Sequence, residues 1–517
     1  MRILKLSLAV LALCGMLCAA EWTTDGGNSK RTGWQKNEHI LTKNNVKNLK
    51  ILWKIKTGNQ PRALHSMMPA VIADNVKTDS GPKQIAIVAG ISDNLYAIDV
   101  KTGTIIWKKH FTYAPVKHKH NFFDQSNTPP RHLGFLGPGG SSDVPVIGPP
   151  DARGRRPVYF VDGGGTMHTL SAADGEDLKP PFKFATGKGW ALNLVNGTIW
   201  MPHGGTKISA VRLDDPSHVM SSTDGSGGMW GLRGVSVDST GTAWTTTGDG
   251  IYDPSNGKLA NGIVGFHLVD GQMKVKDWYV PTDWKWIRKR DLDPNNTPAI
   301  FTYKGRELMV ASGKECRLFL LDPRSPGGAN HQTPLYRSPL FCNDQVDFQN
   351  VGSWGGITTW VDANGTRWIL APFWGPPSIH TKYPIVNTPV SRQGGIAAFK
   401  LEENNGKWRL VPAWVSPNMD RAYPPIVANG VVYAFGSGES TQQAWPIIGL
   451  DFDSSIRAKH STHATLYALD AETGKELYSS GDQIKTFTHF TELAVANGRI
   501  YLGTYDGTEY CFGLPRH

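Results

Sequence analysis

The chain has 517 residues, including 57 Gly, 34 Pro and 18 Trp, and only 19% of its residues are charged. This composition is typical of many short strands and turns with aromatic packing between them, and it argues against a mainly helical protein. The formal net charge is +10, spread along the chain apart from a basic run at 285–290. Because no recognition motif accompanies this charge, we predict no nucleic-acid binding and a surface suited to an acidic partner.

The first 20 residues have the layout of a secretory signal peptide. Basic Arg2 and Lys5 precede an apolar run that ends in the small-residue site Cys18-Ala19-Ala20. That run is too short to cross a membrane, and no later apolar stretch approaches the length of a transmembrane segment. We therefore expect a periplasmic or secreted protein whose mature chain is 21–517, and Cys18 leaves a lipoprotein as an alternative.

The stretch 95–107 is typical of two short strands joined by a tight turn. Asp99 can accept hydrogen bonds from turn amides, Gly103 can adopt a positive φ, and Trp107 can pack between neighbouring sheets. Nearly the same sequence returns at 466–478, with a tyrosine in the position of Trp107. A pattern met twice at such a distance indicates an array of repeats.

A second repeated phrase consists of a strand, a turn with Gly, Asp or Asn, another strand and a small-residue exit. A version of the 95–107 element follows each copy, so each repeat has four strands and we predict an all-β, eight-bladed β-propeller. Two stacked β-sandwiches would explain the strands but not the repeated Trp. The eight copies lie at 68–90, 144–161, 190–202, 232–246, 297–311, 355–371, 424–435 and 490–503.

The two ends of the chain fit ring closure. The segment 507–512 lacks an outer strand, whereas 48–55 is a strand without a blade. Pairing them would remove the open sheet edge, so we predict one propeller over 21–517 that is closed by its terminal strands. The long insertion at 111–143 is rich in His, Pro and Gly and is expected to cover one mouth of the channel.

The phrase Ala-x-Asp-x-x-Thr-Gly-x-x-x-Trp at 97–107 resembles the tryptophan-docking repeat of dehydrogenases that depend on pyrroloquinoline quinone (PQQ). The segments 22–32 and 45–53 are also similar to the start of those propellers. The resemblance covers essentially the whole mature chain and implies the propeller fold. It is less specific for activity, because non-catalytic scaffolds such as the outer-membrane assembly factor BamB carry a similar repeat.

The segment 227–238, followed by Thr-Gly-Asp at 247–249, is similar to the family stretch that supplies a Trp under PQQ and a metal ligand. The resemblance assigns Trp230, with Gly228 beside it, to cofactor binding, because an indole offers a planar quinone a flat apolar surface. Asp249 stands where the family has Asn, and a carboxylate also suits a hard cation such as Ca²⁺. The alternatives are a Trp that packs between blades and an Asp that only stabilises a turn.

The segment 281–322 resembles the family region that supplies a catalytic base and a cation on the next blade. The resemblance implies that Asp291 or Asp293 takes the substrate hydroxyl proton and that Lys314 polarises a quinone oxygen. A solvated turn lysine is the alternative for Lys314. Trp354 and Trp374 are candidates for the channel lining, with packing between blades as their alternative role.

Three departures from the family pattern bear on function. The adjacent Cys pair near the quinone is absent, and its approximate place is taken by 137–142. The metal-binding Glu has no counterpart, because the matching strand exit carries His203, which suits calcium poorly. No CxxCH motif occurs, so no haem is attached covalently and electrons would pass to a separate cytochrome or quinone. Cys316 and Cys342 are candidates for a disulfide, with connectivity left open.

Two functional hypotheses follow from the sequence. The first is an exported enzyme that oxidises an alcohol or sugar-like small molecule with PQQ. The second is a non-catalytic propeller that binds a protein partner and carries a degenerate cofactor site.

Overall fold

The computed structural model describes residues 20–62, 64–114, 140–187, 189–203, 205–223, 227–346, 350–388, 393–442 and 454–515. The predicted signal peptide lies outside these residues except for Ala20, and so does most of the predicted mouth loop, at 115–139. Within the described ranges, no helix is both long enough and apolar enough to cross a membrane.

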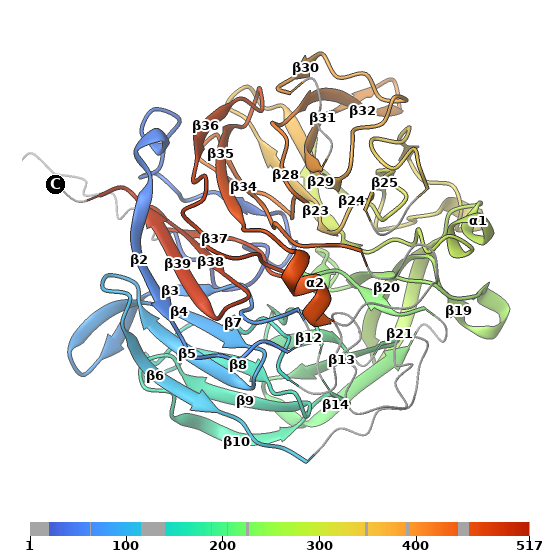
Figure 1. Ribbon diagram of the computed structural model, residues 1–517. Coiled ribbons are helices and arrows are strands. Elements are labelled where there is room, and N and C mark those ends of the chain that lie inside the picture. Colours follow the sequence, from blue (N-terminus) through green and yellow to red (C-terminus); the bar gives the residue numbers. More distant parts are fainter. Residues whose placement is uncertain are drawn as a thin grey trace, which may run out of the picture.

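Eight sheets of four or five strands are arranged around a central axis, which confirms the predicted eight-bladed β-propeller (Figure 1). The strands of each blade that are joined by tight turns pair antiparallel, whereas the short strands β1 and β30 add to blades 7 and 6 in parallel. Blades 1 to 4 comprise β3 (Val71–Thr78), β4 (Gly81–Gly90), β5 (Asn94–Asp99) and β6 (Ile105–His110); β7 (Val146–Ile147), β8 (Pro157–Val161), β9 (Thr166–Ser171) and β10 (Asp177–Lys183); β11 (Asn193–Val195), β12 (Thr198–His203), β13 (Lys207–Arg212) and β14 (Asp215–Thr223); and β15 (Met229–Trp230), β16 (Ser236–Val237), β17 (Ala243–Thr247), β20 (Gly262–Val269) and β21 (Gln272–Tyr279).

The remaining four blades follow the same plan, and the last one combines both ends of the chain. Blades 5 to 8 comprise β23 (Ala299–Tyr303), β24 (Arg306–Ala311), β25 (Phe319–Leu321) and β26 (Tyr336–Arg337); β28 (Thr358–Val361), β29 (Arg367–Trp374), β31 (Gly394–Asn404), β32 (Lys407–Val415) and β30 (Ile385–Val386); β1 (Trp34–Gln35), β33 (Ile426–Ala428), β34 (Val431–Gly436), β35 (Thr465–Asp470) and β36 (Glu476–Ser479); and β37 (Ala494–Ala496), β38 (Arg499–Gly503), β39 (Thr508–Gly513) and β2 (Lys50–Lys56). Between the blades lie the short pairs β18 (Tyr252–Asp253) with β19 (Lys258–Leu259) and β22 (Asn296–Thr297) with β27 (Gly355–Gly356), and the helices α1 (Trp284–Arg288) and α2 (Ser454–His460).

The ring closes as the sequence predicts. Strand β2 pairs antiparallel with β39, with Lys54 opposite Tyr510 and Lys56 opposite Thr508. This pairing gives blade 8 its outer strand and joins the N-terminal part of the chain to the C-terminal blade.

The tryptophans of three outer strands hold neighbouring blades together. Trp107 Nε1 in β6 donates a hydrogen bond to Ala172 O in the next blade at 3.1 Å. A Cβ atom at Gly175, which has φ +76°, would lie 2.9 Å from the Trp107 ring. Trp53 and Trp414 likewise donate a hydrogen bond to a carbonyl of the next blade and pack against the glycine of its turn. The glycine of each turn therefore leaves room for the indole as well as adopting a positive φ.

The N-terminal segment 20–35 contacts a strand near the axis in every blade, a feature that the sequence does not predict. It therefore runs around the axis and connects the blades independently of the outer tryptophans. Its hydrogen bonds join, from blade 1 to blade 8, Trp22 to Ile72, Thr23 to Ile147, Ser29 to Asn193, Ser29 to Val237, Lys30 to Ile300, Thr32 to Thr359, Gly33 to Val427 and Gln35 to Val495.

Two fully buried arginines complete this connection. Arg31 donates to Val235 O at 3.0 Å and to Leu192 O at 2.7 Å. Arg233 donates to Ile357 O at 3.0 Å and from Nε to Glu492 Oε2 at 2.8 Å. These guanidinium groups satisfy carbonyl oxygens that the strand ladders leave unpaired near the axis.

Candidate functional site

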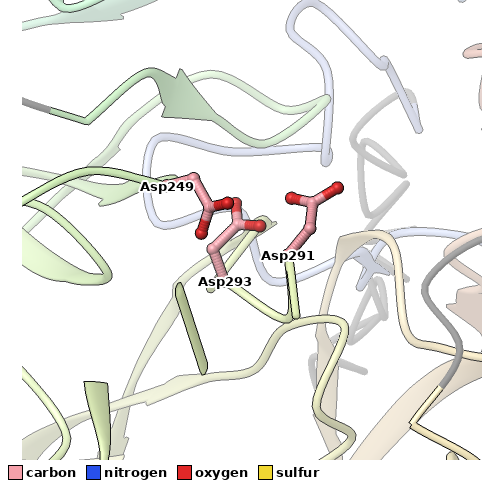
Figure 2. Close-up of side chains that lie close together, drawn as sticks. All are labelled: Asp249, Asp291 and Asp293. Atoms are coloured by element: carbon pink, nitrogen blue, oxygen red, sulfur yellow. The ribbon is translucent and has the colours of Figure 1, made fainter. Parts of the chain in front are cut away.

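Three carboxylates from two loops, one after β17 and one after α1, converge at one position in the ring. One ligand atom each of Asp249, Asp291 and Asp293 lies within 4.8 Å of the others (Figure 2). Asp249 is exposed, Asp291 is partly exposed and Asp293 is buried. The sequence proposed all three for the site, and the structure brings them together.

Local structure explains how these side chains are aimed. Asp249 lies just beyond the end of β17, in the turn at Gly248. Asp291 follows α1 and has φ +54°, a left-handed conformation in which Asp is tolerated better than most residues. The backbone of Asp293 is fixed by one hydrogen bond, which its carbonyl oxygen accepts from Lys314 N at 3.2 Å.

Lys314 is buried among these carboxylates, so it is not a solvated turn lysine. Its Nζ atom lies 2.6 Å from Asp291 Oδ1 and 2.9 Å from Asp293 Oδ1, and its side chain is only 8% exposed. A buried ammonium group requires such partners, because an unpaired charge in the interior is strongly unfavourable. The ammonium group of Lys314 therefore contacts two of the three carboxylates directly.

The charges of the cluster are not balanced. Burial raises the pKa of Asp293 well above its usual value, and Asp291 and Asp249 add to this effect while Lys314 opposes it. Partial desolvation, followed by the charge of Asp291, raises the pKa of Asp249 to about 7. The pKa of Lys314 is raised because Asp293 and Asp291 together outweigh its burial. The raised pKa values mean that a cation bound here would compete with protons for Asp293 and Asp249.

An aromatic cavity adjoins the cluster. It is lined by Trp190, Trp230, Asn295, Trp354 and Phe490, together with the backbone around Gly231 and Gly355. Its volume is about 10 Å³, which is room for roughly one water molecule. The Trp190 and Trp230 rings are 5.5 Å apart and inclined by 40°. The aromatic side chains therefore fill most of the space that they enclose.

Trp230 joins the cavity to the carboxylates. A Cβ atom at Gly248 would lie 2.7 Å from Trp230 Cδ1 and 2.8 Å from Asp293 Oδ2. The carbonyl of Gly228 accepts a hydrogen bond from Gly248 N at 2.6 Å, and a Cβ atom at Gly228 would lie 3.2 Å from Trp230 Nε1. Glycines at both positions thus let the Trp230 ring edge approach Asp293.

Trp354 lines the cavity, whereas Trp374 lies behind it. Their rings stack with centroids 5.0 Å apart and an angle of 27°. Lys314 Nζ lies 5.2 Å from the Trp354 ring centroid, so the cluster also borders this wall. Trp374 Nε1 donates to Ala422 O of the next blade at 2.9 Å, which is the packing role that the sequence gave as its alternative.

Two polar groups in the cavity wall have no hydrogen-bond partner among the described residues. Both amide atoms of Asn295, which is 3% exposed, are unpaired, and so is Trp354 Nε1. Buried polar atoms are almost always paired in folded proteins, so unpaired ones mark a place where a ligand or water belongs. The sequence did not identify Asn295 as a site residue. Its position two residues after the candidate Asp293 is the signal that could have placed it near the site.

His203 does not contribute to the acidic cluster. Its Nε2 atom lies 2.7 Å from Ser209 Oγ within blade 3, and its Nδ1 atom lies 3.3 Å from Thr186 Oγ1. Burial lowers the pKa of His203 to about 4, so the ring is neutral at pH 7. Its hydrogen bonds are those of a structural histidine.

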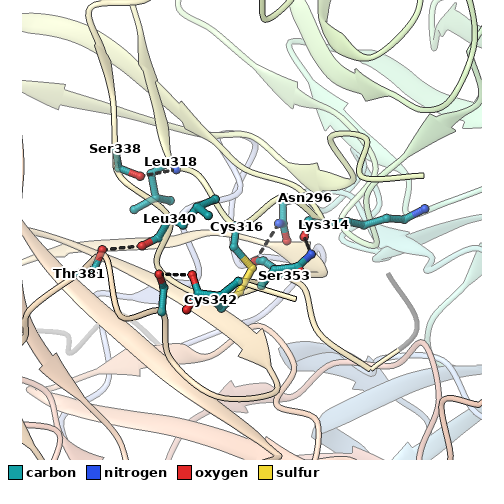
Figure 3. Close-up of a disulfide and its surroundings, with 12 residues drawn as sticks. Asn296, Lys314, Cys316, Leu318, Ser338, Leu340, Cys342, Ser353 and Thr381 are labelled. Atoms are coloured by element: carbon teal, nitrogen blue, oxygen red, sulfur yellow. Dashed lines mark hydrogen bonds between the residues drawn. A yellow bond between two sulfur atoms is a disulfide. The ribbon is translucent and has the colours of Figure 1, made fainter. Parts of the chain in front are cut away.

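A disulfide fixes the loop that carries Lys314. Cys316 and Cys342 are bonded, with their Cα atoms 5.2 Å apart, which settles the pairing that the sequence left open (Figure 3). Asn343, next to this bond, donates from Nδ2 to Lys314 O at 2.7 Å. The disulfide and Asn343 thus hold the backbone of Lys314 against the Asp293 loop.

Solved structures with the same fold include methanol and alcohol dehydrogenases. A europium-containing methanol dehydrogenase is 14% identical, with a TM-score of 0.60, and the match covers 96% of this chain and 98% of that one. A quinohemoprotein alcohol dehydrogenase from Comamonas testosteroni is also 14% identical, with a TM-score of 0.54 and coverage of 96% and 82%. For quinohemoprotein alcohol dehydrogenase ADHIIG from Pseudomonas putida HK5, the values are 11%, 0.56, 96% and 80%. No protein-family model and no curated protein sequence matches this chain. At these identities the comparisons show a PQQ-dehydrogenase-like propeller fold.

Proposed function

We propose that this chain is an exported quinoprotein dehydrogenase that oxidises an alcohol or sugar-like small molecule with PQQ and passes the electrons to a separate acceptor. The observation that carries this proposal is the buried Lys314, paired with Asp291 and Asp293 beside an aromatic cavity. The propeller fold shared with alcohol dehydrogenases supports it.

The residues of the site fit the chemistry of such a cofactor. Trp230 and Trp354 offer aromatic faces, the unpaired amide of Asn295 offers a donor and an acceptor, and Lys314 offers a positive charge. PQQ, when bound, supplies a two-electron acceptor for the oxidation. At about 10 Å³ the cavity admits a planar ligand only after one of its aromatic walls moves.

The carboxylates would have two further roles, proton acceptance and cation binding. Asp291 is 29% exposed and so remains accessible to a substrate hydroxyl, whose proton it can accept. Asp249, Asp291 and Asp293 offer oxygen ligands to a hard cation, which would compensate the charge that Lys314 leaves unbalanced. Lys314 would stabilise negative charge that develops on an acceptor oxygen near Trp354.

Binding of PQQ with Ca²⁺ or Eu³⁺ tests this proposal. The purified chain should show quenching of tryptophan fluorescence and a higher melting temperature when both ligands are present. Trp230→Ala should abolish the response, whereas Trp286→Ala, in the exposed helix α1, should retain it. No response of the wild-type chain at high micromolar PQQ with either ion would contradict the proposal.

A non-catalytic binding propeller is the second candidate function. The small cavity favours it, because aromatic side chains occupy most of the volume that a cofactor would need. In that case neither PQQ nor metal ions would change the melting temperature, and alcohol oxidation would be absent with every artificial acceptor. N-terminal sequencing of the mature protein from the periplasm tests the proposed export separately.

A further inference from the structure

A group of exposed basic residues surrounds an exposed tryptophan on helix α1, at the rim of the ring (Figure 1). We call this group the α1 patch; it consists of Lys285, Trp286, Arg288, Lys289 and Arg290, which are all exposed, and Trp286 is 36% exposed. None of its four basic side chains forms an ion pair with a carboxylate among the described residues. The proposed dehydrogenase does not use this patch.

The opposite side of α1 fixes the helix to the propeller. Ile287 is 1% exposed, and the ring of Trp284 contacts the ring of Tyr252 in β18, with centroids 5.9 Å apart and planes inclined by 74°. Residues on a helix alternate between its faces with a period of 3.6, so the face opposite Trp284 and Ile287 carries Trp286 and the two lysines of the patch. These three side chains therefore point to solvent.

The positive charge of the α1 patch is not neutralised locally. Asp283, which precedes the helix, accepts a hydrogen bond from Arg337 Nη2 at 2.6 Å and so already has a counter-charge. Arg288 faces the acidic cluster, where its charge opposes the rise in the pKa of Asp249 that desolvation causes. The other three basic residues of the patch remain available to an anionic surface.

Apolar groups lie directly beside these charges. The guanidinium group of Arg290 lies over the Trp286 ring, 4.8 Å from its centroid. Ile251, which precedes β18 on the hairpin that packs against α1, is 41% exposed. Indole rings next to lysine and arginine are typical of the membrane–water interface, where the ring lies among the headgroups and the cations contact lipid phosphates.

We propose that the α1 patch binds a membrane surface that contains anionic phospholipids, with Trp286 inserted among the headgroups and Lys285, Lys289 and Arg290 paired with their phosphates. A specific protein interface buries about 800 Å² on each partner, whereas this patch offers one exposed indole on a short helix. A bilayer requires no shape complementarity and therefore fits the patch better than a folded acidic partner does.

Binding through the α1 patch has a consequence for the acidic cluster. Arg290 and Asp291 are adjacent and belong to the same connection between β21 and β23. A chain bound through α1 would therefore hold the acidic cluster close to the membrane surface. This inference goes beyond the proposed dehydrogenase and requires neither PQQ nor a metal ion.

Sedimentation of the purified chain with lipid vesicles tests this inference. The chain should bind vesicles made of equal parts phosphatidylglycerol and phosphatidylcholine and should not bind pure phosphatidylcholine. Roughly 0.5 M NaCl should abolish binding, because salt screens exposed charges. The double variant Lys285→Gln, Lys289→Gln should bind at least about 10-fold more weakly, and Trp286→Ala at least about 5-fold more weakly.

A matched control separates the patch from the overall charge of the protein. Lys50 and Lys54 are exposed on β2 in blade 8, far across the ring from α1 (Figure 1). The double variant Lys50→Gln, Lys54→Gln removes the same charge and should weaken binding by about 2-fold at most. Circular dichroism and melting curves establish that the variants are folded.

Three results would overturn the proposal: equal losses for the two lysine pairs, equal binding to both kinds of vesicle, or retention on immobilised polyglutamate without binding to vesicles. The last result would assign the α1 patch to an acidic protein partner. Trp286→Ala should lose vesicle binding while it keeps its response to PQQ. Failure of this proposal and failure of the proposed dehydrogenase are therefore distinguishable.

Discussion

Lys314 and Asp293 form a buried ion pair, with 2.9 Å between Nζ and Oδ1 and side chains that are 8% and 1% exposed. Asp291 shares the same ammonium group, and Asp249 lies next to both carboxylates. One positive charge thus faces three acidic groups in a partly desolvated site. The arrangement favours either retained protons or a bound cation, and this choice links the site to pH and to metal ions.

Loss of the lysine should destabilise the protein strongly. Lys314→Met leaves the buried Asp293 and the partly exposed Asp291 without their counter-charge, so the free energy of unfolding should fall by about 3–5 kcal/mol. Chemical denaturation at pH 7 measures this change. Lys304→Met removes an exposed partner of Glu403 and should change the free energy of unfolding far less. Equal effects of the two substitutions would show that the buried pair contributes nothing special.

The glycines beneath the tryptophans should be far less replaceable than glycines in open turns. Gly474 has φ +70°, and a Cβ there would lie 2.7 Å from Trp414 Cδ2. Gly406 has φ +78° with no atom within 4 Å of its Cβ position, so it isolates the backbone effect. Gly406→Ala should cost about 1–2 kcal/mol, and Gly474→Ala should cost at least about 1 kcal/mol more because the indole must move. Melting curves of both variants decide the matter.

The carboxyl group of Glu492 should make stability depend on pH. Burial, opposed by Arg233, raises the pKa of Glu492 to about 8. A folded pKa above the unfolded value of 4.5 means that the folded state binds the proton more tightly, so this contribution is complete below pH 4.5 and is lost as the pH rises through about 8. Between pH 5 and 8 the slope is at most about 1.4 kcal/mol per pH unit.

Comparison of the wild type with Glu492→Gln isolates this contribution. The variant should show a flatter dependence of unfolding free energy on pH over the same window. Parallel curves for the two proteins would mean that Glu492 is already ionised in the folded state at pH 5, paired with Arg233.

The disulfide should stabilise both the fold and the position of Lys314. The bond joins residues separated by 26 positions, and a closed loop of that length is worth about 3–4 kcal/mol in the chain-entropy model. The double variant Cys316→Ser, Cys342→Ser should therefore unfold at lower denaturant concentration than the oxidised wild type. It should also bind Eu³⁺ more weakly, because the loop that carries Lys314 and its contact with Asn343 are less restrained. Added reductant should change the wild type but not the double variant.

The predicted blades, their number and the closing pair of strands were all confirmed. These features rest on local patterns: alternating apolar residues, turn glycines such as Gly103, and an aromatic residue at a fixed spacing after them. The convergence of Asp249, Asp291, Asp293 and Lys314 was anticipated only through the family resemblance. No local pattern distinguishes these residues from ordinary turn residues.

Other parts of the molecule had no signal in the sequence. The course of the segment 20–35 around the axis depends on contacts with one strand of each of the eight blades, and these strands are far apart in the chain. Asn295 is a candidate ligand-binding residue because its side-chain amide has no hydrogen-bond partner among the described residues, and only atomic positions reveal this. The hydrogen bond between Glu439 and His489 joins residues 50 positions apart on neighbouring blades.

The sequence by itself determined the repeat, and with it the blade, the ring and the closure, because strand and turn propensities act between residues that are close along the chain. Only the tertiary structure decided which polar side chains meet near the axis, because ring closure brings loops of different blades together regardless of their separation in sequence. It also decided that Lys314 is buried rather than solvated and that aromatic side chains fill most of the neighbouring cavity. Packing, and not local propensity, therefore sets the chemistry of the site.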